Sequence, residues 1–138
     1  MTSARFALAV HVVTLLAGAG AEPLTSEAMA GSVNTNPVVI RRVLAALRAG
    51  GIVASHRGTG GGWRLARDPE TVRLDEIYRC TETGPALGLP RRAANPECPV
   101  GRHIQQVLSS TFAEAEAALE ARLSRESVAD LLRRVLPG

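Results

Sequence analysis

A glycine-rich segment flanked by arginines is the part of this sequence best suited to bind a phosphate group. The segment, HRGTGGGWRLARDP, spans residues 56–69 and places four glycines between Arg57 and Arg64. Glycine-rich loops cradle phosphates in nucleotide-binding enzymes, and they also form tight turns that carry arginines onto nucleic acids. The elements on either side of the loop decide which of these two functions the sequence supports.

The residues around this loop do not match a phosphate-binding enzyme. The sequence contains no lysine, which excludes a phosphate loop of the GK[ST] type. A dinucleotide-binding loop would open a helix, whereas the strand-like run WRLAR follows the glycines here. H-E-x-x-H, G-x-S-x-G and the cysteine–histidine spacings of zinc sites are also absent. We therefore predict that the protein is not an enzyme and binds no metal ion.

Composition and charge predict a small, mainly helical domain with an anionic partner. The 138 residues are 46% hydrophobic but only 3% aromatic, so Leu, Val, Ile and Ala must fill the core, as in packed helices. No acidic residue occurs between Glu27 and Asp68. Six arginines lie in that span: Arg41, Arg42, Arg48, Arg57, Arg64 and Arg67. A block of one charge sign over neighbouring elements is typical of nucleic-acid binding.

The N-terminal segment allows two interpretations. The segment resembles a secretory signal, because it has one arginine, an apolar run and an Ala-Gly-Ala sequence similar to a cleavage site. However, His11 and Thr14 interrupt the run. The apolar residues also recur at helical spacing, at Phe6, Val10, Val13, Leu16 and Ala17. The run is too short to span a bilayer, and two cysteines form at most one disulfide. These features favour a retained first helix in a cytoplasmic protein without membrane contact.

The next segment predicts a helix-turn-helix. Thr25 or Ser26 can cap a short helix, and Asn36 followed by Pro37 indicates the cap and first residue of a second one. The second helix has an apolar face at Ile40, Val43, Leu44 and Leu47, and it ends at Gly50 and Gly51. Its other face, which we expect to be exposed, carries Asn36, Val38, Val39, Arg41 and Arg42. Arg and Asn can read guanine and adenine in the major groove, although a solvated helix face is an equal alternative for this helix alone.

The glycine loop then joins two β-prone runs, IVASHR and WRLAR, into a hairpin. We expect its four glycines to adopt positive φ angles, and Trp63 and Leu65 to pack on the helices. A hairpin in this place is the wing of a winged helix. We therefore expect the loop to contact DNA through Arg57, Gly58, Thr59 and Gly60.

A long apolar stripe in the last third of the chain predicts dimerisation. It begins near Val100 and continues through Ile104, Val107, Leu108, Thr111, Phe112, Ala115, Leu119 and Leu123. A second copy would bury the stripe, although part of it can lie on its own domain. We divide the chain into a winged helix-turn-helix domain (1–80), a variable or sensory loop (81–99), and a dimerisation helix with a short C-terminal helix (100–138). The expected fold is mainly α with a small β-hairpin wing.

The segment NPVVIRRVLAALRAGGIVASHRGTGGGWRLARDPETVRLDEIYR resembles the Rrf2 family of bacterial winged-helix transcriptional regulators. Its specific part is L-x-x-G-G-I-V-x-S-x-R-G-x-G-G-G-W-x-L-A-R-x-P, followed by V-x-L-D-E-I, and the resemblance extends over residues 5–132. It implies a homodimer that binds a roughly palindromic operator on double-stranded DNA. By this resemblance, Asn36, Val38 and Arg41 form the reading end of the recognition helix, and Arg57 is the wing arginine.

The resemblance also raises the question of an iron–sulfur cluster. Cluster-binding members carry three cysteines in the loop before the long C-terminal helix, whereas this chain has only Cys98 there, with Cys80 before the loop. Some also draw a carboxylate from the partner's first helix, where this chain has Ala7 and Leu8. His11 could join the two cysteines, but a fourth ligand is missing. We therefore predict no cofactor and a place in the cysteine-poor, YwnA-like branch.

Cys98 is still a candidate sensor, because His103 lies about one turn away and could activate its thiol. The candidate sensor residues are thus Cys98, His103, Cys80 and His11, and the effector is an unknown small molecule or redox signal. We predict a homodimeric, sequence-specific DNA-binding regulator that acts as a repressor. The alternatives are a winged-helix protein-interaction module without a DNA target, and a redox or iron–sulfur-sensing regulator that uses Cys98.

Overall fold

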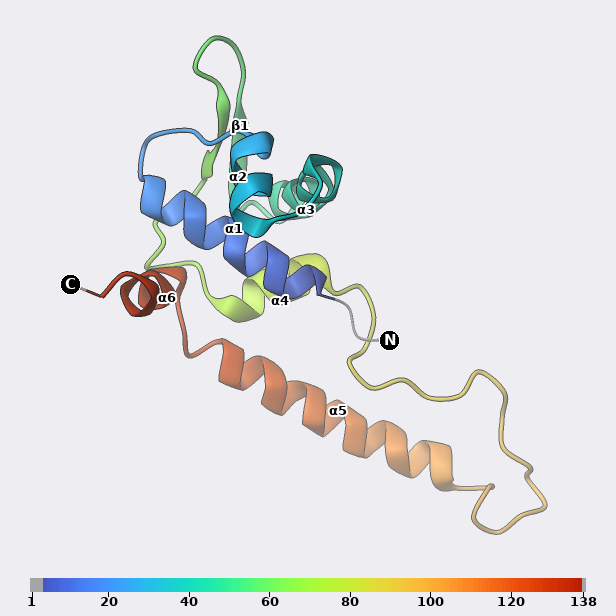
Figure 1. The fold of residues 1–138 in the computed structure, drawn as a ribbon. Coiled ribbons are helices and arrows are strands. Elements are labelled where there is room, and N and C mark those ends of the chain that lie inside the picture. Colours follow the sequence, from blue (N-terminus) through green and yellow to red (C-terminus); the bar gives the residue numbers. More distant parts are fainter. Residues whose placement is uncertain (1–3, 138) are drawn as a thin grey trace.

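The computed structural model describes residues 4–137, which form helices around one end of a β-hairpin (Figure 1). The elements in chain order are α1 (Arg5–Ala19), α2 (Ser26–Val33), α3 (Pro37–Ala49), β1 (Val53–His56), β2 (Gly62–Leu65), α4 (Leu74–Thr81), α5 (Ile104–Leu123) and α6 (Val128–Val135). This arrangement confirms the predicted fold class. Residues 1–3 of the predicted first domain and residue 138 of the last lie outside the described residues.

Helix α1 is the central element of the hydrophobic core. It packs against α2, α3, α4, α6 and β2. Val13 and Leu16 are buried as predicted, but Ala9 and Val12 are buried as well, while Val10 is only partly covered. The buried arc is wider than the predicted stripe because neighbours surround the helix on several sides.

Side-chain caps set the start of the next two helices. The Oγ1 atom of Thr25 accepts a hydrogen bond from the backbone N–H of Ala28 at 3.0 Å, so Thr25 is the cap of α2 and Ser26 is its buried first residue. The Oδ1 atom of Asn36 accepts from the N–H of Val38 at 2.8 Å and caps α3. Helix α3 buries the four residues predicted from its periodicity: Ile40, Val43, Leu44 and Leu47.

The hairpin is antiparallel, and its base is joined to the turn before α2. Val53 pairs with Leu65, and His56 pairs with Gly62 next to the loop. Leu24 adds a bridge on the outer edge of β2, because Leu24 and Trp63 exchange two backbone hydrogen bonds of 3.0 and 2.8 Å. This pairing of Leu24 with the hairpin was not predicted from the sequence.

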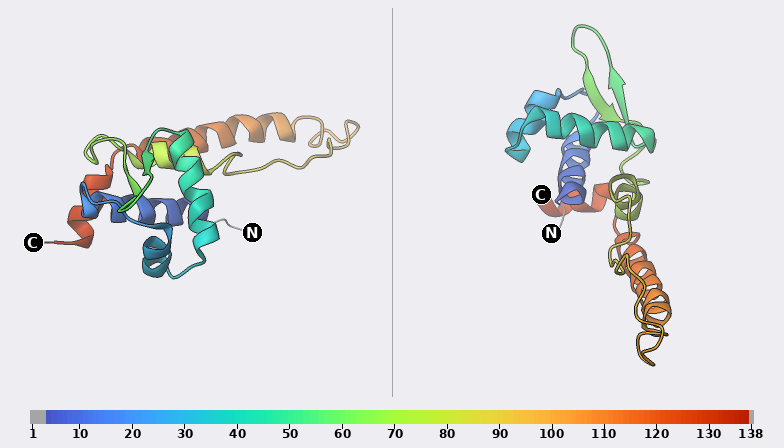
Figure 2. Two further views of the ribbon diagram at one scale, coloured as in Figure 1. Left: turned by 90° about the horizontal axis from the view of Figure 1, so that it is seen from above. Right: turned by 90° about the vertical axis from the view of Figure 1, so that its right-hand side faces the viewer.

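Helix α5 extends away from the body on the side opposite the hairpin (Figure 1 and the right view of Figure 2). None of its 20 residues is fully buried. Its half-buried residues recur every three or four positions and face the protein's own chain: Gln105, Leu108, Phe112, Glu116, Glu120 and Leu123. A separate exposed face, which we call the open face of α5, consists of Ile104, Val107, Thr111, Ala115 and Leu119.

The predicted stripe divides between these two faces, and part of it lies on the protein's own chain, as we expected. Leu108, Phe112 and Leu123 belong to the half-buried face, and only the other members of the stripe are open to a partner. Sequence periodicity merged the two faces because both carry apolar residues. Among residues 4–137, no helix is long and apolar enough to cross a membrane.

A close contact between α3 and α4 gives a stability prediction. Gly50 caps α3 with an ordinary φ of −84°, but a Cβ atom there would collide with Sγ of Cys80. Gly50→Ala should lower the free energy of unfolding by about 1–3 kcal/mol, as overpacked cores do. Cys80→Ala should remove most of this loss in the double variant. Urea denaturation of both variants measures the effect.

The matched control is Gly31→Ala within α2, where a Cβ would meet nothing within 4 Å. Replacing this helical glycine should leave stability unchanged or raise it by about 0.5–1 kcal/mol. If Gly50→Ala lowers the free energy of unfolding as much in the Cys80→Ala background as in the wild type, the proposed contact is contradicted.

Candidate nucleic-acid interface

The loop of the hairpin needs its glycines for two different reasons. Gly58 and Gly60 have φ angles of 98° and 76°, a region that side chains rarely adopt. Gly61 does not have a positive φ, contrary to the sequence-based expectation. It is required because a Cβ atom would collide with the carbonyl oxygen of His56. The loop is therefore a tight turn with an exposed tip, at which Arg57 and Thr59 face solvent.

Trp63 holds the hairpin against the helices. Its backbone pairs with Leu24, and a Cβ atom on the preceding Gly62 would approach the Leu24 carbonyl oxygen to 2.6 Å. On its side-chain face, the guanidinium of Arg48 lies 5.5 Å from the centre of the indole ring, a cation–π arrangement. Because Arg48 is in the last turn of α3, this contact joins the hairpin to α3. The predicted packing of Trp63 on the helices is confirmed, but its contacts with Leu24 and Arg48 were not predicted.

The N-terminal part of α3 is open to solvent. Asn36, Val38, Arg41 and Arg42 are all exposed. The Asn36 oxygen is used in the cap, and among the described residues its amide nitrogen has no hydrogen-bond partner. Arg41 forms an ion pair of 2.6 Å with Glu27 of α2, with side chains that are 53% and 64% exposed. Such exposed pairs are worth about 0–1 kcal/mol, so an anionic ligand can displace Glu27.

The block of six arginines is less uniform than the sequence suggests. Arg67 donates two hydrogen bonds to Glu76 and one to the Thr71 carbonyl, so it stabilises the segment before α4. The bond from Arg67 is the main reason that the pKa of Glu76 lies below its usual value. Within residues 4–137, Arg42, Arg57 and Arg64 form no ion pair. These three arginines on α3 and the hairpin are therefore the members of the block most available to an anionic partner.

The four candidate sensor residues do not form one site in the chain. Cys80 is half-buried on α4, and burial raises the pKa of its thiol. Cys98 is exposed in the loop before α5, where its sulfur accepts a hydrogen bond from the N–H of Gly101. His11 is on α1 and forms a hydrogen bond of 3.2 Å with the Ser32 hydroxyl, while His103 is the residue just before α5. In the described part of the chain, no three His, Cys, Asp or Glu residues could hold a metal ion.

An exposed helix N-terminus beside a basic, glycine-rich hairpin is the arrangement of a winged helix. The sequence profile of the Rrf2 family, described as an iron-dependent transcriptional regulator, matches residues 2–134 of this chain. The chain belongs to the Rrf2 family. It is a transcriptional regulator of the Rrf2 type and not an enzyme, as the sequence predicted.

Similar proteins support this assignment over the whole length. The chain is 36% identical over 135 residues to YwnA of Bacillus subtilis (strain 168), a candidate HTH-type transcriptional regulator. The alignment covers 98% of this chain and 99% of YwnA. A solved structure of a candidate DNA-binding protein is 36% identical, with a TM-score of 0.73 and coverage of 93% of this chain and 98% of that one. IscR from T. potens shares the fold at 23% identity, with a TM-score of 0.74 and coverage of 99% and 88%.

The description of the family as iron-dependent implies an iron centre, but the residues of this chain do not fit an iron–sulfur cluster. Such clusters need four protein ligands, most of them cysteines. The loop before α5 supplies only Cys98, and Cys80 is packed against Gly50 at the end of α3.

The wing loop gives a prediction about salt dependence. Arg57→Ala should weaken DNA binding and reduce the slope of log K against log salt by roughly 0.9 per subunit, because one phosphate contact would be lost. The measurement is a titration of DNA at several salt concentrations. Arg125→Ala, which removes an exposed arginine between α5 and α6, is the matched control and should change neither quantity. Identical slopes for wild type and Arg57→Ala would exclude the wing from the interface.

Proposed function

We propose that the protein is a homodimeric, sequence-specific DNA-binding repressor of the bacterial cytoplasm. The observation that carries this proposal is the joining of α3 and the hairpin through Arg48 and Trp63, which presents both elements as one positively charged surface. Repression requires only that the dimer occupies an operator. The family assignment supports the regulatory role.

In the proposed complex, the N-terminal turn of α3 enters the major groove. Arg41 exchanges its bond to Glu27 for guanine O6 and N7, and the free amide of Asn36 faces adenine. Val38, which is 47% exposed, is placed to contact a thymine methyl group. The loop residues Arg57, Gly58, Thr59 and Gly60 approach the neighbouring phosphates or minor groove, and Arg42 adds a backbone contact.

A second copy would cover the open face of α5. Val107 is 57% exposed and Val100, just before the helix, is 68% exposed, which is unfavourable for apolar side chains in water. Another apolar surface lies between α1 and α6, in a groove of about 770 Å³ that ends at Val135 and Leu136. Symmetric dimers bury the same surfaces on both copies. The dimer would therefore present one α3 to each half of a palindrome.

A winged-helix module that binds only proteins is the second candidate function. The exposed Val38 within the α3 surface favours it, because an apolar residue can contact a protein as readily as a thymine. The two functions differ in their dependence on salt and base sequence.

Selection from a random DNA library tests the proposed function. We expect an inverted repeat whose half-sites are centred about one helical turn apart. Arg41→Ala should then relax discrimination at a particular base pair in each half-site by about 1–3 kcal/mol, while Arg125→Ala should leave the preference intact. Failure to enrich any sequence, with a folded protein, would favour the protein-binding module.

The open face of α5 gives a prediction about assembly. Val107→Glu should produce monomers in sedimentation, because it places a charge in the proposed interface. Ala117→Glu is the matched control, since Ala117 is an exposed alanine of the same helix that is not part of the open face. A dimer that survives Val107→Glu, or that dissociates equally with Ala117→Glu, would locate the interface elsewhere.

We further propose that regulation does not use an iron–sulfur cluster. Anaerobic reconstitution with iron and sulfide should leave the purified protein colourless, with no visible absorption band. A stable band that disappears in Cys98→Ala would refute this and would make His11, Cys80 and Cys98 the first residues to examine as ligands.

A further inference from the structure

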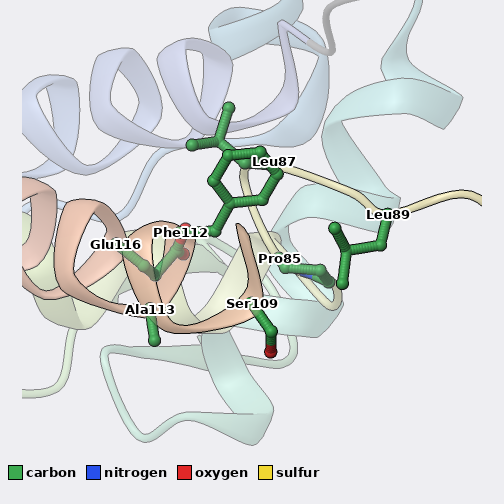
Figure 3. Close-up of a pocket in the computed structure, with 7 residues that line it drawn as sticks. All are labelled: Pro85, Leu87, Leu89, Ser109, Phe112, Ala113 and Glu116. Atoms are coloured by element: carbon green, nitrogen blue, oxygen red, sulfur yellow. The ribbon is translucent and has the colours of Figure 1, made fainter. Parts of the chain in front are cut away.

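The loop between α4 and α5 leads away from the body, and α5 returns beside it (Figures 1 and 2). The first part of the loop and α5 together line an open cavity of about 390 Å³ (Figure 3). Pro85, Leu87 and Leu89 of the loop form one wall, and Phe112 and Ala113 of α5 form the other. A cavity of this volume is within the range of about 300–1,000 Å³ that is typical of sites for small organic ligands. Leu87 and Leu89 are 47% and 38% exposed, so a ligand would remove apolar surface from water.

Two polar side chains, Ser109 and Glu116, complete the lining of the cavity. Each oxygen of the Glu116 carboxylate already accepts one hydrogen bond of 2.9 Å, from the Tyr78 hydroxyl and from the backbone N–H of Ala86. Both donors are neutral. In the described residues, no arginine or histidine forms an ion pair with this carboxylate. The apolar cavity therefore contains a fixed negative charge without a counter-ion.

We propose that this cavity binds a small organic ammonium ion with an apolar body. The aliphatic and aromatic walls suit the apolar part, and Glu116 attracts the positive nitrogen. The ring of Phe112 lines the same cavity and adds a cation–π contact. An anion of the same shape would be repelled, and a neutral analogue would lack the attraction to Glu116.

The cavity remains open when the proposed dimer forms. At 100° per residue, Ser109 and Glu116 lie about a third of a turn or more around α5 from the centre of its open face, and Phe112 lies at the border between the cavity and that face. A second copy seated on Ile104, Thr111 and Ala115 would thus leave the cavity accessible.

The position of Glu116 connects the cavity to the DNA-binding surface. Its partner Tyr78 is a buried residue of α4, with a pKa raised to about 12 mainly by burial, so the hydroxyl remains a hydrogen-bond donor. The Tyr78 ring also packs edge-on against Phe6 of α1 at 5.3 Å, and α4 packs against α3. A ligand that competes for Glu116 would weaken the joint between α5 and α4, and we expect operator affinity to change. This regulatory consequence rests on the proposed DNA-binding function.

Three probes of similar size test the ligand class on the full-length, DNA-free protein: phenethylammonium, 2-phenylethanol and phenylacetate. Calorimetry should show at least tenfold tighter binding of the cation than of the alcohol, and no binding of the anion. Glu116→Gln should reduce the affinity for the cation at least tenfold and leave the alcohol unchanged. Ala113→Leu narrows the cavity without altering Glu116 and should weaken both, whereas Ala117→Leu, outside the lining, should weaken neither.

Equal binding of cation and alcohol, or full cation affinity in Glu116→Gln, would overturn the proposal. A change of oligomeric state in Ala113→Leu would also overturn it, because a second copy would then cover the cavity. Operator affinity is measured separately, with and without phenethylammonium. Ligand binding without any DNA binding would refute the proposed function alone, and unchanged operator affinity would refute the regulatory link alone.

Discussion

The attachment of Trp63 to the helices determines where the wing lies relative to α3. A two-stranded hairpin is marginally stable by itself, so the wing requires an anchor to hold a fixed position. Trp63 provides it through the backbone pair with Leu24 and through the stacking of Arg48 from α3. The tip is consequently held close to α3, and two elements that are separate in the chain form the surface that we propose for DNA.

The two ends of the molecule carry the two proposed interfaces, one for DNA and one for a second copy of the chain. At one end, α3 and the hairpin carry arginines without ion-pair partners in the described residues. At the other end, α5 carries apolar side chains that water solvates poorly, and it extends away from the body (Figure 2). The loop and cavity lie along α5, where a ligand can influence the joint with α4 without blocking the DNA surface.

The sequence predicted the elements whose cause is local. The cap at Asn36, the proline after it and the apolar periodicity of α3 all involve neighbouring residues, and each is present in the structure. Contacts between distant residues had no such local signal. The bond between Glu116 and Ala86 joins positions 30 apart, the Arg67–Glu76 pair removes one arginine from the charged block, and periodicity could not separate the two faces of α5. The cavity follows from these distant contacts, so only the structure reveals it.

Site-specific photo-crosslinking to the selected operator tests the central claim, that α3 and the wing form one DNA-binding surface. A photoreactive residue would replace Val38 of α3 in one variant and Thr59 of the wing in another, with Ala117 of α5 as the control position. Our account predicts that the first two variants crosslink to the same operator fragment, at neighbouring base pairs, and that the control does not. Bound DNA that crosslinks from position 117 but from neither 38 nor 59 would contradict it.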